Sequence, residues 1–399
     1  MSQFDIKTFN SIAIEGLQRF TKDKYTINET DDPSAIILRS YNLHDEPISD
    51  SLLAVGRAGA GYNNIPVDKL SEAGVVAFNA PGANANSVKE LVLTSLISHA
   101  RNTIEASQWA TELTGDDIAT QVEDGKKKFK GHEIKGKTLG VIGLGQVGLL
   151  VANDAENLGM DVIGYDPYIS VDAAWNINRS VTKASSIDEV LQKADYITIH
   201  VPYLDSTKHM IDSTAIRQMK ATAVLLNFSR AEIVDEDALV KALNHNRLGH
   251  YISDFPNETV LGQDKVTLLP HLGASTGESE KNSAVMVANE LKDYLENGNI
   301  VNSVNYPRVS MTLSSPLRIA VCNRNIKNII ASLTKLLSEE GLNIDRIINK
   351  SRGDYAYTLV DITEADEEKV KDLIQEIESK DGILKVRLIK NLEHDAWYN

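Results

Sequence analysis

The feature that most constrains the fold is a glycine fingerprint near the middle of the chain. An apolar, β-branched run ends in Gly143-x-Gly145-x-x-Gly148, and a helix-like stretch follows. Here the first glycine permits a tight turn, the second lets backbone approach a pyrophosphate, and the third lets helix pack closely on strand. Free N–H groups at the helix N-terminus favour the anion. The segment therefore predicts a strand–turn–helix unit that binds a dinucleotide; the alternative is a glycine-rich turn without a ligand.

The next strand-like run places a carboxylate where the ribose of a dinucleotide would lie. Residues 161–165 end at Asp166, at about the spacing of a ribose-binding acid. A carboxylate accepts hydrogen bonds from a free ribose 2′-OH and repels a 2′-phosphate. We therefore expect NAD, rather than NADP, as the cofactor.

Length and composition restrict the class of protein. The 399 residues suffice for two or three domains, and the formal net charge of −15 argues against nucleic-acid binding. No apolar run approaches the roughly 18 residues of a membrane span, and the N-terminus lacks the features of a secretory signal. The single cysteine, Cys322, fits a reducing cytoplasm. We expect a cytoplasmic protein without a metal, nucleic-acid or membrane partner.

Strand-like runs alternate with helical stretches along most of the chain. This alternation predicts an α/β protein with doubly wound parallel sheets. Long helical patterns at 84–107 and 276–297 mark where the chain crosses between domains. We expect a substrate domain from 1–83 and 276–306, and a nucleotide domain from 84–275. The expected strands are 35–38, 52–55, 75–78, 138–142, 161–165, 196–200, 223–227 and 265–268.

Residues 315–399 follow a different pattern, after a linker-like stretch at 305–308. Strand-like and helix-like runs come in the order βαββαβ, which is typical of a small ferredoxin-like module. The expected strands are 317–322, 344–350, 355–361 and 383–389, and the expected helices are 326–340 and 364–379. This module carries no catalytic-looking cluster of its own.

Arg230 is the first candidate for chemistry. It comes just after the strand that ends at Asn227, where doubly wound sheets bind their ligands. Its planar guanidinium can hold a carboxylate through two parallel hydrogen bonds. The alternative is a surface arginine that pairs with Glu232 or Asp235.

His271 is the candidate general acid–base. It lies between Pro270 and a turn at Gly273, again at a strand end. The ordinary pKa of histidine is near neutrality, which suits proton transfer. A carboxylate against the far ring nitrogen would fix its tautomer, and Glu258 is the candidate for that role. The alternative is a histidine that only packs or faces solvent.

A third loop, residues 57–64, also follows a strand. Glycines at Gly59 and Gly61 expose backbone N–H groups that can form an anion-binding nest. Arg39 and Arg57 add positive charge to it. We interpret the basic run at 126–130 as a solvated face.

Several motifs in order resemble the D-isomer-specific 2-hydroxyacid dehydrogenases. They are residues 59–64, 79–84, 143–148, 227–230 and 270–276. The lead-in at 131–138 and the C-terminal module, which resembles an ACT regulatory domain, match the phosphoglycerate dehydrogenase branch of this family. The resemblance implies a flavodoxin-like substrate domain and a Rossmann NAD domain. It also implies NAD-dependent oxidation of 3-phospho-D-glycerate to 3-phosphohydroxypyruvate, the first step of L-serine biosynthesis, by a homodimer or homotetramer.

The resemblance assigns roles position by position. The implied catalytic residues are Arg230 on the substrate carboxylate, His271 for proton exchange and Glu258 as its orienting partner. The implied substrate-binding residues are Arg39 and Arg57 at the phosphate, with Ala60, Gly61, Asn63 and Asn64 at the carboxylate. The implied cofactor-binding residues are Gly143, Gly145, Gln146, Val147, Gly148, Asp166, Pro202, Thr207, Ser229, Asp254 and Gly273. Asp254 is followed directly by Phe255, one residue sooner than is usual in the family.

The implied regulatory ligand is L-serine. Asn325 and Asn343 match positions that hold serine in regulated relatives, while Asn323 stands where the family has a histidine. The turn at 323–328 lacks the family's proline and glycine, and Asn328 can supply a left-handed residue in their place. Rival interpretations are a hydroxypyruvate, glyoxylate, D-lactate or 2-oxoglutarate reductase of the same fold, and a scaffold that binds NAD without turnover.

Overall fold

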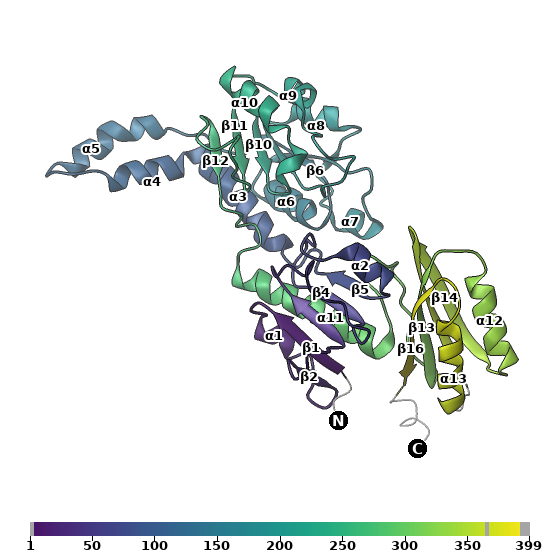
Figure 1. The fold of residues 1–399 in the computed structure, drawn as a ribbon. Coiled ribbons are helices and arrows are strands. Elements are labelled where there is room, and N and C mark those ends of the chain that lie inside the picture. Colours follow the sequence, from purple (N-terminus) through teal and green to yellow (C-terminus); the bar gives the residue numbers. More distant parts are fainter. Residues whose placement is uncertain (1–3, 364–366, 392–399) are drawn as a thin grey trace. The chain divides into compact units, whose positions relative to one another are not determined.

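Two chain crossings divide the protein into two units (Figure 1). The computed structural model describes residues 4–363 and 367–391. One unit contains residues 1–83 and 280–399, and the other contains residues 84–279. The long helix α11, Gly277–Asn297, carries the chain from the second unit back to the first.

The first unit is built on a five-stranded parallel sheet of order β2-β1-β3-β4-β5, the flavodoxin-like arrangement. Its strands are β1 (Phe4–Phe9), β2 (Tyr25–Ile27), β3 (Ala35–Leu38), β4 (Ala54–Arg57) and β5 (Val76–Asn79). Short helices α1 (Ile14–Leu17) and α2 (Val67–Glu72) complete it. Strand β3 is buried on both faces: Ile37 lies in one core with Leu291 of α11, and Ile36 in another with Leu70 of α2. This explains its continuous apolar sequence.

Glycine permits the close approach of α11 to this sheet. A Cβ atom at Gly56 of β4 would lie 2.5 Å from Cγ1 of Val287 on α11. A larger residue at this position would therefore push the helix away from the sheet.

The second unit contains a seven-stranded parallel sheet of order β12-β11-β10-β9-β6-β7-β8. This is the Rossmann order, with β6 at the switch point. The strands are β6 (Thr138–Ile142), β7 (Asp161–Tyr165), β8 (Thr182–Lys183), β9 (Tyr196–Ile199), β10 (Val224–Asn227), β11 (His250–Ser253) and β12 (Val266–Leu268). The main helices are α3 (Ala85–Arg101), α6 (Gln146–Asn157), α7 (Val171–Asn176), α8 (Ile187–Lys193), α9 (Ser213–Gln218) and α10 (Glu236–Asn244). The two doubly wound sheets confirm the predicted fold class.

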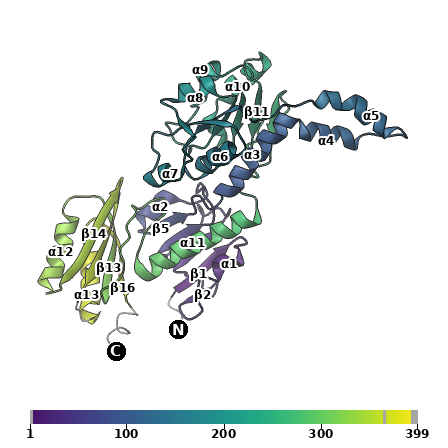
Figure 2. The same cartoon turned by 180° about the vertical axis from the view of Figure 1, so that it is seen from behind.

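The helix expected at 84–107 is two helices. The first, α3, ends at Asn102, whose φ of +51° is left-handed, and α4 (Thr103–Thr111) begins there. With α5 (Ile118–Gly125), α4 forms a hairpin that extends away from the sheet of its own unit (Figures 1 and 2). Trp109 packs against Phe129 inside the hairpin, with 5.3 Å between ring centroids.

The C-terminal part of the first unit is an antiparallel sheet of order β14-β15-β13-β16 with two helices on one face (Figure 1). Its elements are β13 (Leu317–Arg324), α12 (Ile329–Glu339), β14 (Ile344–Arg352), β15 (Tyr355–Ile362), α13 (Glu367–Glu378) and β16 (Ile383–Lys390). The βαββαβ order and the strand arrangement confirm the ferredoxin-like prediction. Of the expected helix at 364–379, residues 364–366 lie outside the described residues, as do residues 392–399.

The sheet of this module is covered on both faces. Alternate residues such as Ile319 and Val360 pack under α12 and α13. The intervening residues, among them Cys322 and Tyr357, share a core with Tyr294 of α11. Asn305, in the stretch expected to be a linker, is buried, and its side chain bonds to the backbone of residues 75 and 77.

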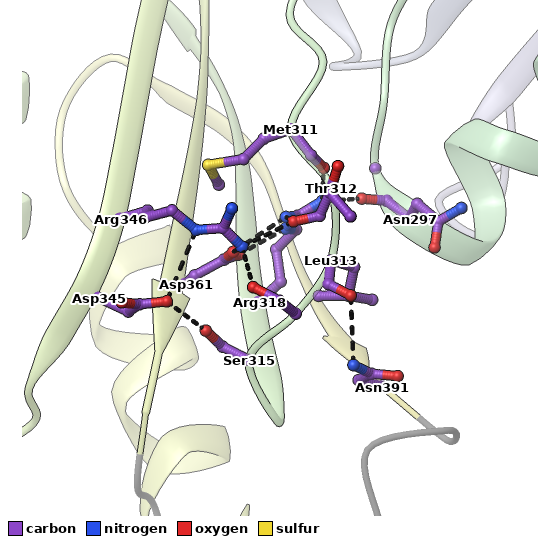
Figure 3. A network of polar contacts seen from close by, with 12 residues as sticks. Asn297, Met311, Thr312, Leu313, Ser315, Arg318, Asp345, Arg346, Asp361 and Asn391 are labelled. Carbon is purple, nitrogen blue, oxygen red and sulfur yellow. Dashed lines mark hydrogen bonds and ion pairs between the residues drawn. The ribbon is translucent and has the colours of Figure 1, made fainter. Parts of the chain in front are cut away.

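A buried ion pair fastens the module to the end of α11 (Figure 3). Arg318 of β13 is fully buried, and its Nε donates to Oδ1 of Asp361 on β15 at 2.6 Å. The same guanidinium donates to the carbonyls of Asn297 (2.7 Å) and Met311 (2.8 Å). Arg346 completes the network by donating to Oδ2 of Asp361 at 2.9 Å. The buried charges are therefore paired, and their remaining donors meet backbone carbonyls.

No helix among the described residues is long and apolar enough to cross a bilayer.

Candidate active site

The glycine fingerprint forms the turn between β6 and α6. Gly143 has a left-handed φ of +91°, and a Cβ atom there would lie 2.7 Å from the carbonyl oxygen of His200. A Cβ at Gly148 would lie 1.9 Å from the oxygen of Gly143, so α6 packs on the turn only without a side chain. Gly145 is different, because a Cβ there would meet nothing within 4 Å. The turn therefore has open space on the side where a pyrophosphate would approach.

The N-terminus of α6 is suited to an anion. Gln146 and Val147 occupy its first two positions, and the preceding Gly145 offers no side chain to cap the helix. The first N–H groups of a helix have no partner within the helix, and they attract negative charge together with the dipole. These residues fit the diphosphate of NAD.

Asp166 lies directly beside this turn. It follows β7, and its Oδ2 accepts a hydrogen bond from the Leu144 N–H at 2.9 Å. Its Oδ1 accepts from the Tyr168 N–H at 2.8 Å. A carboxylate can accept about four hydrogen bonds, so lone pairs remain for ribose hydroxyls.

Two further cofactor-side segments lie at the carboxyl ends of β9 and β10. The Thr207 hydroxyl donates to the Pro202 carbonyl at 2.7 Å and closes the loop after β9. The Ser229 hydroxyl donates to the Ile199 carbonyl at 2.7 Å and ties the loop after β10 to the end of β9. Parallel strands present their ligand sites at this edge.

Arg230 is exposed at the start of a short 3-10 helix, Ala231–Ile233. Its Nη1 donates to the Ser229 carbonyl at 2.6 Å, and its own carbonyl accepts from the buried Asn227 side chain at 2.8 Å. Among the described residues, Arg230 forms no ion pair with Glu232 or Asp235. Asp235 instead caps α10 by accepting from the Ala238 N–H at 3.0 Å. The guanidinium is therefore held through Nη1 by the Ser229 carbonyl, and its other N–H groups are available for an anion.

Asp254 fixes the turn that carries His271. It is 1% exposed, and its two oxygens accept from the N–H groups of Leu272 and Gly273, each at 2.7 Å. His271 adopts a left-handed conformation with a φ of +55°. Burial raises the pKa of Asp254, while the two N–H donors and the nearby His271 oppose that rise. One buried carboxylate thus holds the two consecutive N–H groups that follow His271.

The structure does not pair His271 with Glu258. Both residues are exposed, and within the described parts of the chain no ion pair joins them. The His271 ring instead meets the edge of Phe255, with centroids 5.1 Å apart. The charge of His271 lowers the pKa of Asp254, which lies against the same turn. The orienting role of Glu258 stays a prediction.

Sequence reasoning missed His200, which follows β9 opposite the glycine turn. Its Nε2 lies 2.9 Å from the Thr198 hydroxyl, and desolvation lowers its pKa to about 3. This histidine is therefore neutral at physiological pH. Its backbone carbonyl packs directly against Gly143 of the glycine turn. The only sequence signal for it is its place at the end of a predicted strand.

In the first unit, Arg39 and Arg57 lie at the ends of neighbouring strands. Leu38 of β3 pairs with Arg57 of β4, so Arg39 extends one residue beyond that pair. The Arg57 Nε donates to the Arg39 carbonyl at 3.1 Å. A Cβ at Gly59 would lie 2.2 Å from the Arg57 Nη1, so the guanidinium lies across this glycine. The Arg39 Nη1 lies 2.7 Å from Oε1 of Glu280 on α11.

The loop at 59–64 is held by side chains from adjacent loops. The Asn79 amide donates to the Ala60 carbonyl at 2.6 Å, and His44 bonds to the Asn63 carbonyl at 3.0 Å. The Asn64 amide donates to the Arg39 carbonyl at 3.1 Å. Gly61 lies in the same loop. The sequence-predicted substrate residues are thus brought together at one edge of the first sheet.

The three regulatory asparagines are not brought together within one chain. Asn323 is buried and Asn325 bonds to the Gly353 carbonyl at 3.0 Å, at one end of the module's sheet. Asn343 bonds to Thr363 at 3.1 Å, at the opposite end. Asn328 adopts the expected left-handed conformation, with a φ of +71°.

Comparison with known proteins decides the family. The chain is 31% identical to the D-3-phosphoglycerate dehydrogenase of Escherichia coli K12, over 86% of this chain and 82% of that protein. The chain belongs to the D-isomer-specific 2-hydroxyacid dehydrogenase family. Residues 93–273 match the model of this family's NAD-binding domain. It is accordingly an NAD-dependent oxidoreductase.

Solved structures of the family share the fold. A glyoxylate reductase from Paecilomyes thermophila has a TM-score of 0.61 at 25% identity, covering 76% of this chain and 98% of its own. An NAD-bound 3-phosphoglycerate dehydrogenase of Entamoeba histolytica has a TM-score of 0.57 at 24% identity, covering 76% and 99%. The fold therefore does not choose between phosphorylated and unphosphorylated substrates.

Proposed function

We propose that this 2-hydroxyacid dehydrogenase oxidises 3-phospho-D-glycerate to 3-phosphohydroxypyruvate with NAD, which is the first step of L-serine biosynthesis. The observation that carries the proposal is the pair of arginines at the ends of β3 and β4. Arg39 and Arg57 are adjacent, and the backbone of one is held by the side chain of the other. Two guanidinium groups at one sheet edge suit a phosphate. A 2-hydroxy acid without a second acidic group, such as D-glycerate, has nothing that needs both.

His271 performs the proton step in this proposal. Bound NAD supplies the hydride acceptor. The neutral imidazole of His271 accepts the proton of the C2 hydroxyl as the C2 hydride leaves. The turn held by Asp254 fixes where this imidazole can reach. Asp254, which holds the turn, and Glu258, the partner that the resemblance implies, are the carboxylates proposed to stabilise the imidazolium.

Arg230 binds the substrate's acid end. Its fork can bond to the carboxylate and to the carbonyl oxygen that forms at C2. Asn227 holds the backbone of Arg230, and the guanidinium itself donates to the Ser229 carbonyl, so the charge is positioned before substrate arrives. The resemblance also assigns Ala60, Gly61, Asn63 and Asn64 of the 59–64 loop to the substrate carboxylate.

The variant Arg57→Gln tests the phosphate assignment. We expect kcat/KM for 3-phospho-D-glycerate to fall about ten- to hundredfold, because a charged hydrogen bond is lost. The value for D-glycerate should change by less than about threefold. Parallel losses for both substrates would assign Arg57 to the general stability of the loop and remove the phosphate site.

Reduction of glyoxylate, hydroxypyruvate or 2-oxoglutarate is the alternative activity. The glyoxylate reductase among the solved neighbours supports it at the level of fold. Glyoxylate and hydroxypyruvate have no second anionic group, so both arginines should be dispensable for them, whereas the distal carboxylate of 2-oxoglutarate can pair with a guanidinium. The same variant therefore separates the two activities.

We also propose that the ferredoxin-like module is an ACT domain that binds L-serine. Asn323 and Asn325 lie at the opposite end of the sheet from Asn343, so a site that uses all three needs a second copy of the module. Titration of L-serine against the rate of NAD reduction tests this. Unchanged rates at millimolar serine would contradict it.

A homodimer or homotetramer in the cytoplasm completes the proposal. No residue of α4 is buried, and the α4–α5 hairpin exposes the apolar side chains of Ile104 and Ile118. Exposed apolar side chains on an extended hairpin favour a protein contact.

The single cysteine, Cys322, is buried and free, as a reducing compartment permits. Light scattering of the purified protein measures the oligomer.

A further inference from the structure

Glu280, on the first turns of α11, ion-pairs with the arginine assigned to the substrate phosphate. Its Oε1 lies 2.7 Å from Nη1 of Arg39, and the two side chains are 46% and 38% exposed. Both residues belong to the first unit of the chain. A carboxylate therefore already occupies the guanidinium that an incoming phosphate would need.

We propose that Glu280 is an affinity-setting residue whose carboxylate competes with the substrate phosphate for Arg39. This inference rests on the proposed function. It concerns the phosphate end of the substrate and leaves the chemistry at C2 unchanged.

The backbone of Arg39 is fixed while its side chain is free to exchange partners. The Arg39 carbonyl accepts from Arg57 Nε and from the Asn64 amide, each at 3.1 Å. The Asn10 side chain accepts from the next two N–H groups, Ser40 at 3.0 Å and Tyr41 at 2.7 Å. The guanidinium itself pairs with Glu280 alone among the residues that the structure describes. Substrate binding therefore replaces the Glu280 carboxylate with the substrate phosphate on the Arg39 guanidinium, while the Arg39 backbone stays fixed.

Charge decides the direction of this exchange. A phosphate monoester carries a charge between about −1.5 and −2 near neutral pH, and it can accept two parallel bonds from a guanidinium. A single glutamate carries less charge, and an ion pair this exposed is weak. The phosphate therefore displaces Glu280, but it must break the pair and then tolerate a like charge nearby. Glu280 weakens the binding of phosphorylated substrate and product alike, and it speeds product release.

The chain offers a matched control on the same helix. Lys281 of α11 pairs with Glu15 of α1, with 3.2 Å between Nζ and Oε1. Glu15→Gln removes the same charge from the same unit as Glu280→Gln and leaves Arg39 untouched. A general effect of net charge would appear in both variants.

The test measures kcat and KM for 3-phospho-D-glycerate in the full-length protein. We expect Glu280→Gln to lower KM about two- to fivefold, the range of an exposed ion pair, and Glu15→Gln to leave it unchanged. Arg39→Gln should raise KM at least about tenfold, and adding Glu280→Gln to it should have no further effect. The KM for D-glycerate should not respond to Glu280→Gln.

The outcomes separate the two proposals. If Arg39→Gln leaves KM unchanged, the phosphate does not meet Arg39, and both the proposed substrate and the role of Glu280 are overturned. If Arg39→Gln raises KM but Glu280→Gln leaves it unchanged or raises it, only the competition is overturned. Equal effects of Glu280→Gln and Glu15→Gln would also overturn it, in favour of net charge.

Discussion

At the scale of single residues, the turn at 271–273 explains how one histidine can serve as a general acid–base. Its left-handed conformation is costly for a residue other than glycine, and it persists because the Asp254 carboxylate holds the next two N–H groups. Backbone strain that a buried carboxylate maintains is common where a side chain must be aimed. The exposed imidazole is therefore positioned by its backbone.

His271→Ala should lower kcat by a factor of about 10² to 10⁴, the usual contribution of a general acid–base. The reason is the loss of the group that accepts the C2 hydroxyl proton. Steady-state rates of NAD reduction measure the effect, and NADH affinity of the variant controls for folding. A folded variant with near-normal turnover would remove His271 from the mechanism.

The residue scale also shows what the sequence could and could not predict. Arg230 and His271 were predictable because each follows a strand end, where parallel sheets place their sites. The role of Asp254 in holding the His271 turn was not, because the contact spans 18 residues and depends on how β11 and β12 pair. The expected partner, Glu258, followed only from the resemblance, and spacing along a chain does not fix where an exposed side chain points.

At the scale of elements, buried charges fasten the C-terminal module to the first unit. Asp361 receives hydrogen bonds from Arg318 and from Arg346, and its side chain is fully buried. Such a pair contributes little relative to apolar residues, but breaking it leaves a lone charge in a buried site.

Asp361→Asn should therefore lower the free energy of unfolding by about 3–5 kcal/mol, because the Arg318 charge loses its counter-ion. Urea denaturation measures this. The matched control is Asp345→Asn, whose side chain is 39% exposed and pairs with Arg346 at 3.5 Å at the rim of the same network. That change should cost less than about 1 kcal/mol. Similar losses in the two variants would contradict the importance of burial.

A second buried carboxyl, after Asp361 of β15, lies on helix α11. Glu290 is 8% exposed and accepts from the Asn302 amide, and burial raises its pKa from 4.5 to about 7. Between these pH values the folded chain keeps a proton that the unfolded chain has released. The free energy of unfolding therefore falls as pH rises through this window and stays lowered above it.

Glu290→Gln should remove this pH dependence. At about pH 8 the variant should be more stable than the wild type by roughly 1–3 kcal/mol, and at about pH 4 the two should agree. Urea denaturation at both pH values gives the comparison, with the exposed Glu278→Gln on the same helix as the control. A variant less stable than the wild type at the higher pH would show that Glu290 is needed as a carboxylate.

Helices and strands were predictable where the hydrophobic pattern of the sequence was strong. Short strands that form only by pairing with neighbouring strands were not. The glycine-flanked strand β6 and the ferredoxin-like order were both predicted. Strands β1 and β11 were not, because polar residues interrupt them: Asp5 and Lys7 in β1, and His250 in β11. Pairing with β3 and with β10 and β12 makes them strands. The break at Asn102 also escaped prediction, since asparagine carries only a weak preference for the left-handed region.

At the scale of the whole molecule, the chain divides its tasks between two units. Unit 84–279 contains the glycine fingerprint, Asp166, Arg230 and His271, to which we assign cofactor binding and chemistry. The other unit contains Arg39, Arg57 and the loop at 59–64, to which we assign substrate selection. In the proposed function, the chemistry is a property of the family, and the choice of substrate is made by the strand ends of the first sheet.

The most direct measurement of the central claim is the ratio of kcat/KM for 3-phospho-D-glycerate to that for D-glycerate, with NAD as the acceptor. These substrates differ only in the phosphate that the account assigns to Arg39 and Arg57. We expect the phosphorylated acid to be preferred by a factor of about 10² or more, from two charge-assisted contacts. A ratio near one, or a preference for the unphosphorylated acid, would contradict the account.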